Sequence, residues 1–508
     1  MKKRLTKKQM IIFSVGQFGW SLLGGIISAW LVTFFMPTQL DVAQLGATQY
    51  IAGGLIIGGF LTIIGLITAV SRIFDAVTDP LIASLSDRSR NKRGRRIPFM
   101  QIAAIPFATI TVLLFCVDFG AGSWANILWV SIMIVLFYLF MTMYCTPYNA
   151  LISEFGQNQE DRMFISTAIS FTYLFGTLFA YLPFVIAGAS YDTDKGVLSN
   201  KLVTNLLVNS GMDQASAFAW SFRICFIILA VIACAAMLIP ALTLKETEFI
   251  DPKPSNENVF RSLVSTFKNK DFRVFSASDI MYWVGLTMFQ TGLPYFVKIS
   301  MGFDAGMTML FMGGMSILAA VFYPFVTKFV KKFGKKKLVI AGFLGLALCY
   351  AIAAISSIPG ICPQQGDGAN IMSWVFGIAI MVISALPMAL LGIIPQSIVA
   401  DVAEAEAKTT GQNREGMFFA ARTFAMKFGQ SLAMILFTSL AVAMAASGDH
   451  TDEVYPDKPG MIIVAAVAVA FCILGAVLLM FYREKKVMKI IAKEEDKEFL
   501  KAIENEKE

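Results

Sequence analysis

The 508-residue chain alternates long apolar segments with short polar breaks along its whole length. Segments such as Phe99 to Cys116, Ile127 to Tyr144 and Met461 to Tyr482 come near the roughly 20 residues that a helix needs to cross a bilayer. They are apolar all round, whereas helices of a soluble core keep a solvated face. The pattern predicts twelve membrane helices, near residues 9–37, 50–85, 98–117, 124–152, 163–188, 217–243, 272–299, 304–330, 337–358, 370–398, 416–446 and 460–482.

Composition supports a membrane protein. Hydrophobic residues make up 56% of the chain and charged residues 15%, against roughly a quarter charged in soluble domains. No small-residue cleavage site follows a short apolar region near Met1, so we expect the first helix to be retained. Seven scattered cysteines show no metal-ligand spacing, and we expect neither a disulfide framework nor a zinc site.

Basic residues are distributed unevenly over the breaks. They crowd before the first helix and in 88–96 and 331–337, while 38–49, 118–123 and 359–369 contain none. Because Lys and Arg are retained on the cytoplasmic side, we expect a multi-pass protein of the cell membrane with both termini in the cytoplasm. This bias accounts for the net charge of +7, so the charge does not indicate nucleic-acid binding.

The basic loops also indicate an internal repeat. Arg90 to Arg96 and Lys331 to Lys337 each set a glycine among bases, six predicted helices apart, although positive-inside topology alone would place basic loops at both positions. Two parallel six-helix repeats are the build of major facilitator transporters. The division we expect is an N-terminal bundle, a cytoplasmic linker, a C-terminal bundle and a charged, solvated tail, at 1–243, 244–271, 272–482 and 483–508.

The second predicted helix carries two acids at membrane depth. Asp75 and Asp79 stand four residues apart on one helical face, with Thr78 beside Asp75 and Arg72 one turn earlier. Two carboxylates so close cannot both stay ionised cheaply, so they should bind a cation or share a proton. The alternative is a structural cluster in which Arg72 neutralises one aspartate.

Other polar side chains inside predicted helices are candidate ligand groups. Arg422 and Lys427 lie in the eleventh helix, where Lys427 requires an anionic or polyhydroxyl ligand, or the acids of the second helix, as partner. A run of hydrogen-bonding groups surrounds Pro147 in the fourth helix, and we expect it to line a polar cavity. For the aromatic Trp20 and Tyr148, stacking on a ligand and simple packing both stay open.

These residues carry a resemblance. The chain resembles the glycoside-pentoside-hexuronide:cation symporters, the melibiose permease family of the major facilitator superfamily, over most of its length. The carriers of the resemblance are Gly16 to Gly19, Arg72 to Pro80 with Ser86 to Arg88 and Gly94 to Arg96, Pro147 to Leu151 with Asp161 and Arg162, and Ala400 and Asp401 with Lys408, Thr409, Arg414 to Gly416 and Lys427.

The resemblance implies an all-α fold of two six-helix bundles and a Na⁺, Li⁺ or H⁺ site. That site would be formed by Asp75, Asp79, Thr78 and Thr142, with Lys427 near both cation and sugar. Two positions that hold sugar-binding aspartates in melibiose permeases are Ser21 and Cys145 here, and an aromatic position is Asn149. The candidate substrate-binding residues are Trp20, Ser21, Arg72, Cys145, Tyr148, Asn149, Arg422 and Lys427.

The function we expect is cation-coupled symport of a sugar by alternating access, with no cofactor besides the coupling ion. Charged residues at the cytoplasmic side are candidates for closing contacts between the bundles, namely Arg88, Arg95, Arg96, Asp401, Arg414 and Glu415. A lipid or other non-sugar carrier on the same scaffold is the alternative. An enzyme or ATP-driven pump is not expected, because the chain has no phosphate-binding Gly-x-x-x-x-Gly-Lys-Ser/Thr loop and its one histidine, His450, lies in an outer loop.

Overall fold

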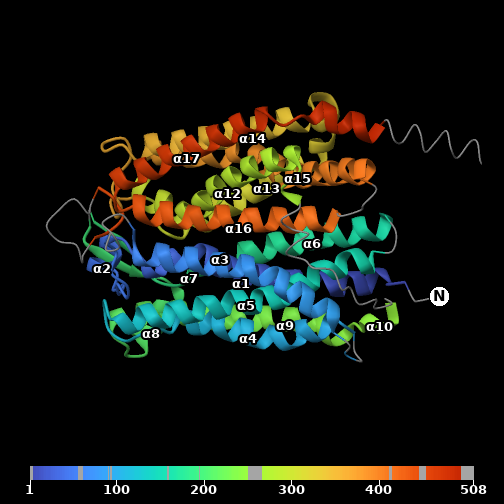
Figure 1. Ribbon diagram of the computed structural model, residues 1–508. Helices are drawn as coiled ribbons and strands as arrows, with labels where there is room; N and C mark the ends of the chain where they lie inside the picture. The colour runs from blue at the N-terminus through green and yellow to red at the C-terminus, as the bar shows by residue number, and fades with distance from the viewer. Residues whose placement is uncertain are drawn as a thin grey trace, which may run out of the picture.

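The computed structural model is an elongated bundle of helices that run side by side (Figure 1). It describes residues 4–54, 61–89, 91, 94–156, 159–193, 195–249, 266–410, 415–444 and 454–492. The long helices are α1 (Lys7–Phe35), α3 (Ile63–Arg88), α4 (Ile97–Phe115), α5 (Trp124–Phe155), α6 (Gln159–Phe179), α9 (Gln214–Thr243), α12 (Lys270–Tyr295), α13 (Met307–Phe333), α14 (Lys335–Ser356), α15 (Ile371–Thr410), α16 (Glu415–Leu440) and α17 (Lys458–Met480).

These twelve long helices in the described part of the chain match the twelve predicted segments, and the three largest differences at their ends are as follows. The segment predicted from residue 50 becomes helical only at Ile63, after the glycine-containing stretch 50–54 and the N-cap Thr62, so its predicted start is wrong. The segment predicted to end at residue 188 stops at Phe179, close to Pro183. The tenth segment continues past residue 398 to Thr410.

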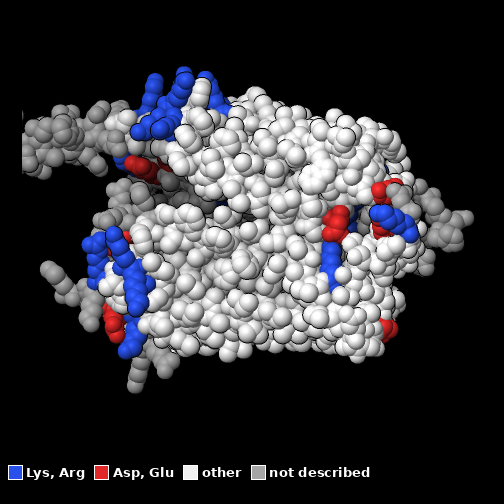
Figure 2. Space-filling model, turned by 180° about the vertical axis from the view of Figure 1, so that it is seen from behind, with Lys and Arg blue, Asp and Glu red and all other residues white. Residues whose placement is uncertain are grey.

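Short elements close one end of the bundle. The loop after α1 holds α2 (Gln39–Gln44), and the chain after α6 forms α7 (Pro183–Ile186), an antiparallel hairpin of β1 (Ala189–Asp192) and β2 (Val197–Asn200), and α8 (Leu202–Asn209). A π-helical turn, η1 (Phe296–Ser300), follows α12. We call this the hairpin end. Figure 2 shows Lys and Arg gathered at the opposite end, which we call the basic-loop end.

The helices form two groups that follow chain order. Helices α1 to α9 pack with one another, as do α12 to α17, and the two groups lie side by side in Figure 1. The main contacts between the groups are those of α16 with α3 and of α1 with α12. The expected all-α fold of two six-helix bundles is confirmed.

Each bundle carries the same brace at the basic-loop end. Glu246, in the short helix α10 (Glu246–Phe249), accepts hydrogen bonds from the backbone N–H groups of Arg96 (2.8 Å) and Ile97 (3.2 Å) at the start of α4. Glu484, after α17, accepts from the backbone N–H groups at the start of α14, at 2.7 and 3.2 Å. In both bundles, a carboxylate after the sixth helix therefore caps the start of the third helix, where anions are stabilising.

Candidate functional site

The polar site lies where three long helices with charges in their interior meet. Nine helices in the described ranges are long and apolar enough to cross a membrane, and α3, α12 and α16 are not among them. These three are the helices that carry the charges at membrane depth, and α16 packs against both α3 and α12. Their polarity is thus explained by mutual contact, because charges inside a membrane face one another or a cavity.

Lys427 of α16 bridges both aspartates of α3. Its ammonium lies 2.8 Å from Asp75 Oδ1 and 2.6 Å from Asp79 Oδ2, and it donates to the backbone carbonyl of Asp75 at 3.2 Å. The side chains of Lys427 and Asp75 are buried, at 6% and 0% exposure, while Asp79 retains 24%. The i,i+4 spacing places both carboxylates on the face of α3 that meets α16. The cluster therefore joins the two bundles near the middle of both helices.

Threonines of α5 complete the cluster. Thr142 donates its hydroxyl to Asp75 Oδ1 at 2.6 Å, and Thr146 donates to Asp79 Oδ1 at 3.2 Å. Thr78 donates to the backbone carbonyl of Asp75 at 3.0 Å. Thr146 was not among the predicted cation-site residues. Its i,i+4 spacing places it on the same face of α5 as Thr142, but that spacing does not show which helix this face meets.

One carboxylate oxygen of this cluster has no partner. Asp75 Oδ2 is buried and accepts no hydrogen bond from the described residues. Such an oxygen carries the cost of lost hydration without compensation, which native structures rarely leave unexplained. Together with the threonine hydroxyls, it supplies the oxygen ligands that hard cations prefer. The donor set is thus chemically suited to a small monovalent cation or a proton.

Arg72 does not neutralise either aspartate in the described contacts. Its guanidinium instead lies over the ring of Tyr138 on α5, 4.7 Å from the ring centre. Lys427 supplies the positive charge to both carboxylates. The predicted alternative, a structural Arg72–aspartate pair, is therefore not what the structure contains.

A second buried ion pair lies on the other side of α16. Arg422 donates to both carboxylate oxygens of Asp279 on α12, at 2.9 and 3.2 Å. One turn along α12, the indole of Trp283 lies beside the same carboxylate of Asp279. The indole N–H of Trp20 on α1 is buried and has no hydrogen-bond acceptor among the described residues. The ring of Trp20 is half-buried, and its N–H is available as a donor to a bound molecule.

The remaining predicted substrate residues divide into packed and accessible positions. Ser21 donates to the carbonyl of Phe18 and lies against Gly176 of α6, and Tyr148 stacks on Phe13 with ring centres 4.4 Å apart. Both are buried in helix contacts. Cys145 is buried within electrostatic reach of Asp75, Asp79 and Lys427, whereas Asn149 is exposed.

Three of the predicted gating residues, Arg95, Arg96 and Asp401, have contacts within their own bundle or the linker. Arg95 lies 3.8 Å from Glu246, and the backbone of Arg96 donates to the same carboxylate. Asp401 pairs with Lys335, 2.5 Å away in the same bundle. Arg414 and the side chains of Arg88 and Glu415 lie outside the described residues. The predicted role of these six residues in closure stays a prediction.

Comparison with known proteins agrees with this architecture. A model of the family described as MFS/sugar transport protein matches residues 12–485. The chain is 26% identical to the uncharacterized symporter YjmB of Bacillus subtilis (strain 168), covering 86% of this chain and 83% of the relative. It is 23% identical to the putative glycoside/cation symporter YagG of Escherichia coli (strain K12), covering 94% and 90%.

Two further similarities extend the range of relatives. The sodium-dependent lysophosphatidylcholine symporter 1-A of Danio rerio is 21% identical, with 95% of this chain and 86% of the relative covered. The crystal structure of a D-xylose-proton symporter is similar in fold, with a TM-score of 0.61, 14% identity, and 94% and 98% of the two chains covered. The family match over most of the chain, the twelve-helix fold and the charged contact between its bundles agree, and the chain belongs to the MFS/sugar transport protein family of membrane transporters.

Proposed function

We propose that this transporter is a cation-coupled sugar symporter, with Asp75 and Asp79 as the cation site. The observation that carries the proposal is the ammonium of Lys427 held between these two carboxylates while Asp75 Oδ2 stays unpartnered. A Na⁺, Li⁺ or H⁺ ion arriving at the carboxylates competes with the ammonium for the same oxygens. The ion would be held by both carboxylates and the hydroxyls of Thr142, Thr146 and Thr78.

Competition at this site gives a physical route to coupling. Once the cation neutralises the aspartates, the ammonium of Lys427 loses its partners and requires new acceptors, which the hydroxyl groups of a sugar supply. Sugar that engages Lys427 in turn frees the carboxylates for the cation. Each ligand raises the affinity of the other by the same factor, as linkage requires.

The sugar site in this proposal lies between the bundles, around α16. Arg422 and Asp279 hold each other in place and present a charged pair, Trp283 lies beside this pair, and Trp20 offers an unused indole donor. Aromatic faces and convergent polar groups are typical of sites that bind polar small molecules. The family description and the name of YagG, a putative glycoside/cation symporter, support a sugar as cargo.

A lysolipid is the second candidate cargo. A relative of similar coverage is named a sodium-dependent lysophosphatidylcholine symporter, and Ser21 and Cys145 provide no carboxylates to bind sugar hydroxyls. The cation site would be unchanged in this case. We favour the sugar because the family as a whole is described by sugar transport.

We further propose that the basic-loop end faces the cytoplasm of the cell membrane, with the hairpin end outside. The clusters of Lys and Arg at residues 2–8, 88–96 and 331–337 support this orientation. Both termini would then be cytoplasmic. Protease protection of sealed, right-side-out vesicles tests it, because the hairpin end should be cleavable from outside.

Uptake into proteoliposomes tests the main proposal. Labelled glycosides, pentoses, hexuronides and lysophosphatidylcholine would be offered under imposed Na⁺, Li⁺ or H⁺ gradients. We expect one sugar class to accumulate uphill with one gradient, and Asp75→Asn and Asp79→Asn to abolish accumulation. Asp192→Asn, which removes an exposed carboxylate at the hairpin, is the control. Wild-type uptake that no cation gradient affects would disprove the coupling, and lipid accumulation in place of sugar would replace the cargo.

A further inference from the structure

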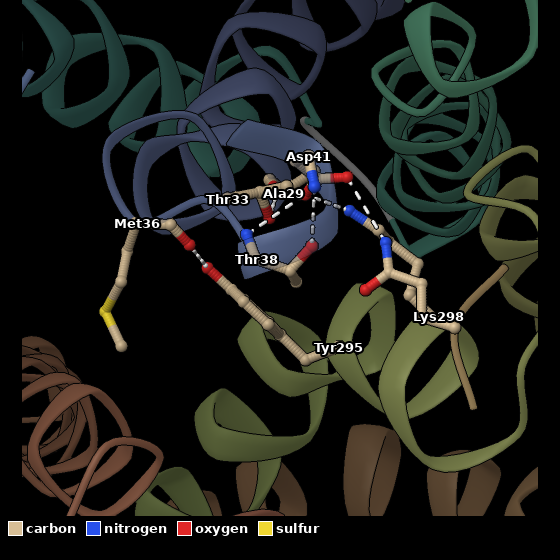
Figure 3. Close-up of polar contacts among 8 residues, drawn as sticks. Ala29, Thr33, Met36, Thr38, Asp41, Tyr295 and Lys298 are labelled. Atoms are coloured by element: carbon tan, nitrogen blue, oxygen red, sulfur yellow. Dashed lines mark hydrogen bonds and ion pairs between the residues drawn. The ribbon is translucent and has the colours of Figure 1, made fainter. Parts of the chain in front are cut away.

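A buried ion pair joins the two bundles at the hairpin end, far along the chain from the cation site. Lys298 of η1 contacts the carboxylate of Asp41 on α2, 257 residues away in sequence. Their side chains are only 9% and 8% exposed. Figure 3 shows the lysine reaching from one bundle to the aspartate of the other. Neither residue was singled out by the sequence, and the proposed transport chemistry does not use them.

The position of Asp41 is fixed by its own helix. Its carboxylate accepts from the backbone N–H of Thr38 at 3.1 Å, and the Thr38 hydroxyl accepts from the backbone N–H of Asp41 at 3.3 Å. This capping box begins α2. The side-chain amide of Gln365, from the other bundle, donates to the second carboxylate oxygen at 3.3 Å. The carboxylate therefore has donors from both bundles, and its side chain has little freedom.

The partner lysine is presented by an unusual turn. Residues Phe296–Ser300 form a π-helix directly after α12, and such turns occur often at functional sites. Immediately before the turn, the hydroxyl of Tyr295 donates to the backbone carbonyl of Met36 at 2.7 Å (Figure 3). Two successive contacts from one helix end thus reach the chain that follows α1 in the other bundle.

Further contacts between the bundles surround this pair. Lys201 pairs with Asp304 at 2.8 Å, and the backbone N–H of Thr193 donates to the carbonyl of Gly366 at 2.9 Å. Asp41, Lys298, Lys201 and Asp304 all border one cavity of about 440 Å³ at this end. The contacts span the gap between the bundles and must separate if that gap is to open.

We infer that Asp41, Lys298 and Tyr295 form an outer latch, which holds the hairpin end closed and must break for the outward-open form to appear. This rests on the proposed alternating-access function and orientation. A buried ion pair suits a reversible contact, because the charges regain hydration when the pair separates and this offsets much of the lost attraction. The latch therefore sets the balance between the two forms without contacting the cation site.

Hydrogen–deuterium exchange on the purified protein tests the latch without any ligand. In Lys298→Gln we expect amides of α2 and η1 to exchange roughly tenfold faster or more, since loss of one partner of a buried pair is costly. The end of α15 at the basic-loop end should exchange more slowly, because the bundles close there when the hairpin end opens. This opposite change at the far end separates a latch from local damage.

Three variants make the test specific. Tyr295→Phe, which removes a single hydroxyl, should give a smaller change of the same sign at both ends. The exchanged pair Asp41→Lys with Lys298→Asp restores the ion pair but not the capping box of α2, so it should return both ends part of the way to wild type. Lys195→Gln removes an exposed ion pair within the hairpin, and it should leave both ends unchanged.

Two results would overturn the latch: unchanged exchange in Lys298→Gln, or faster exchange at the hairpin end with no slowing at the basic-loop end. Failure of cation-driven uptake in proteoliposomes would instead count against the proposed symport. Because the exchange experiment contains neither sugar nor a cation gradient, the two failures are distinguishable.

Discussion

Replacing Lys427 by glutamine should make the protein bind its coupling cation more tightly. The substitution keeps a polar side chain, one bond shorter, but removes the ammonium that lies 2.8 Å from Asp75 and 2.6 Å from Asp79. In the proposed mechanism, a cation must displace this ammonium before it can occupy the carboxylates. In the variant there is nothing to displace, and two buried acids are left without a counter-charge.

The contacts set the size of the effect. Removing one partner of a buried ion pair costs about 3–5 kcal/mol, and the lower value applies here because Asp79 keeps 24% of its surface exposed. If the cation recovers this energy, about 3 kcal/mol corresponds to about 150-fold in affinity. Lys427→Gln should therefore bind Na⁺, Li⁺ or H⁺ up to about 150-fold more tightly, while uphill sugar accumulation is lost.

Isothermal titration of NaCl or LiCl into purified protein, in a buffer free of both ions, measures this affinity directly. Arg422→Gln is the matched control, because it removes another buried cation from α16 whose partner is Asp279. Its affinity for the coupling cation should stay at the wild-type value. Unchanged or weaker cation binding in Lys427→Gln would refute the idea that ammonium and cation compete for the same oxygens.

Three predictions concern the frame around the site. Gly19→Ala should destabilise the protein by about 1–3 kcal/mol in thermal unfolding, since the new methyl group would meet a backbone carbonyl of α9. Gly24→Ala has open space and should leave stability unchanged or raise it by up to about 1 kcal/mol. Glu246→Gln weakens the cap on α4 and should cost about 1–3 kcal/mol in the same assay. The hydrogen bond from Arg4 lowers the pKa of Asp161, so this carboxylate stabilises the fold at neutral pH. The stability gap between wild type and Asp161→Asn should shrink as pH falls below about 4, and a constant gap would contradict the assignment.

The sequence contained the core of the proposed cation site, because local spacing determines it. Asp75 and Asp79 share a helical face whatever the tertiary fold, and a lysine at membrane depth requires an anionic or polar partner. Lys427 was accordingly expected to meet a polyhydroxyl ligand or these acids, and it meets the acids. The contribution of Thr146 depends on how α5 is rotated against α3, which spacing within one helix does not specify.

Other features depended on long-range contacts that no local pattern reports. In the sequence, Asp41 is a single acidic residue in a predicted loop, and Lys298 is a lysine near the end of a predicted helix. Only the packing of the two bundles brings these side chains together. Ser21 and Tyr148 lie on the expected helices, yet their side chains are buried in helix packing. The resemblance located these positions along the chain, but the rotation of each helix decides what a side chain contacts.

The glutamate braces of the two bundles have a mechanical consequence. Because Glu246 and Glu484 each tie the end of a sixth helix to the start of a third, each bundle is closed on itself and can tilt as one lever. Two rigid bundles that tilt relative to each other rotate about the place where they stay in contact. Helices α3 and α16 are in contact near their midpoints through Asp75 and Lys427. The proposed cation would then bind at the place about which the two bundles tilt, and it would influence the opening at both ends.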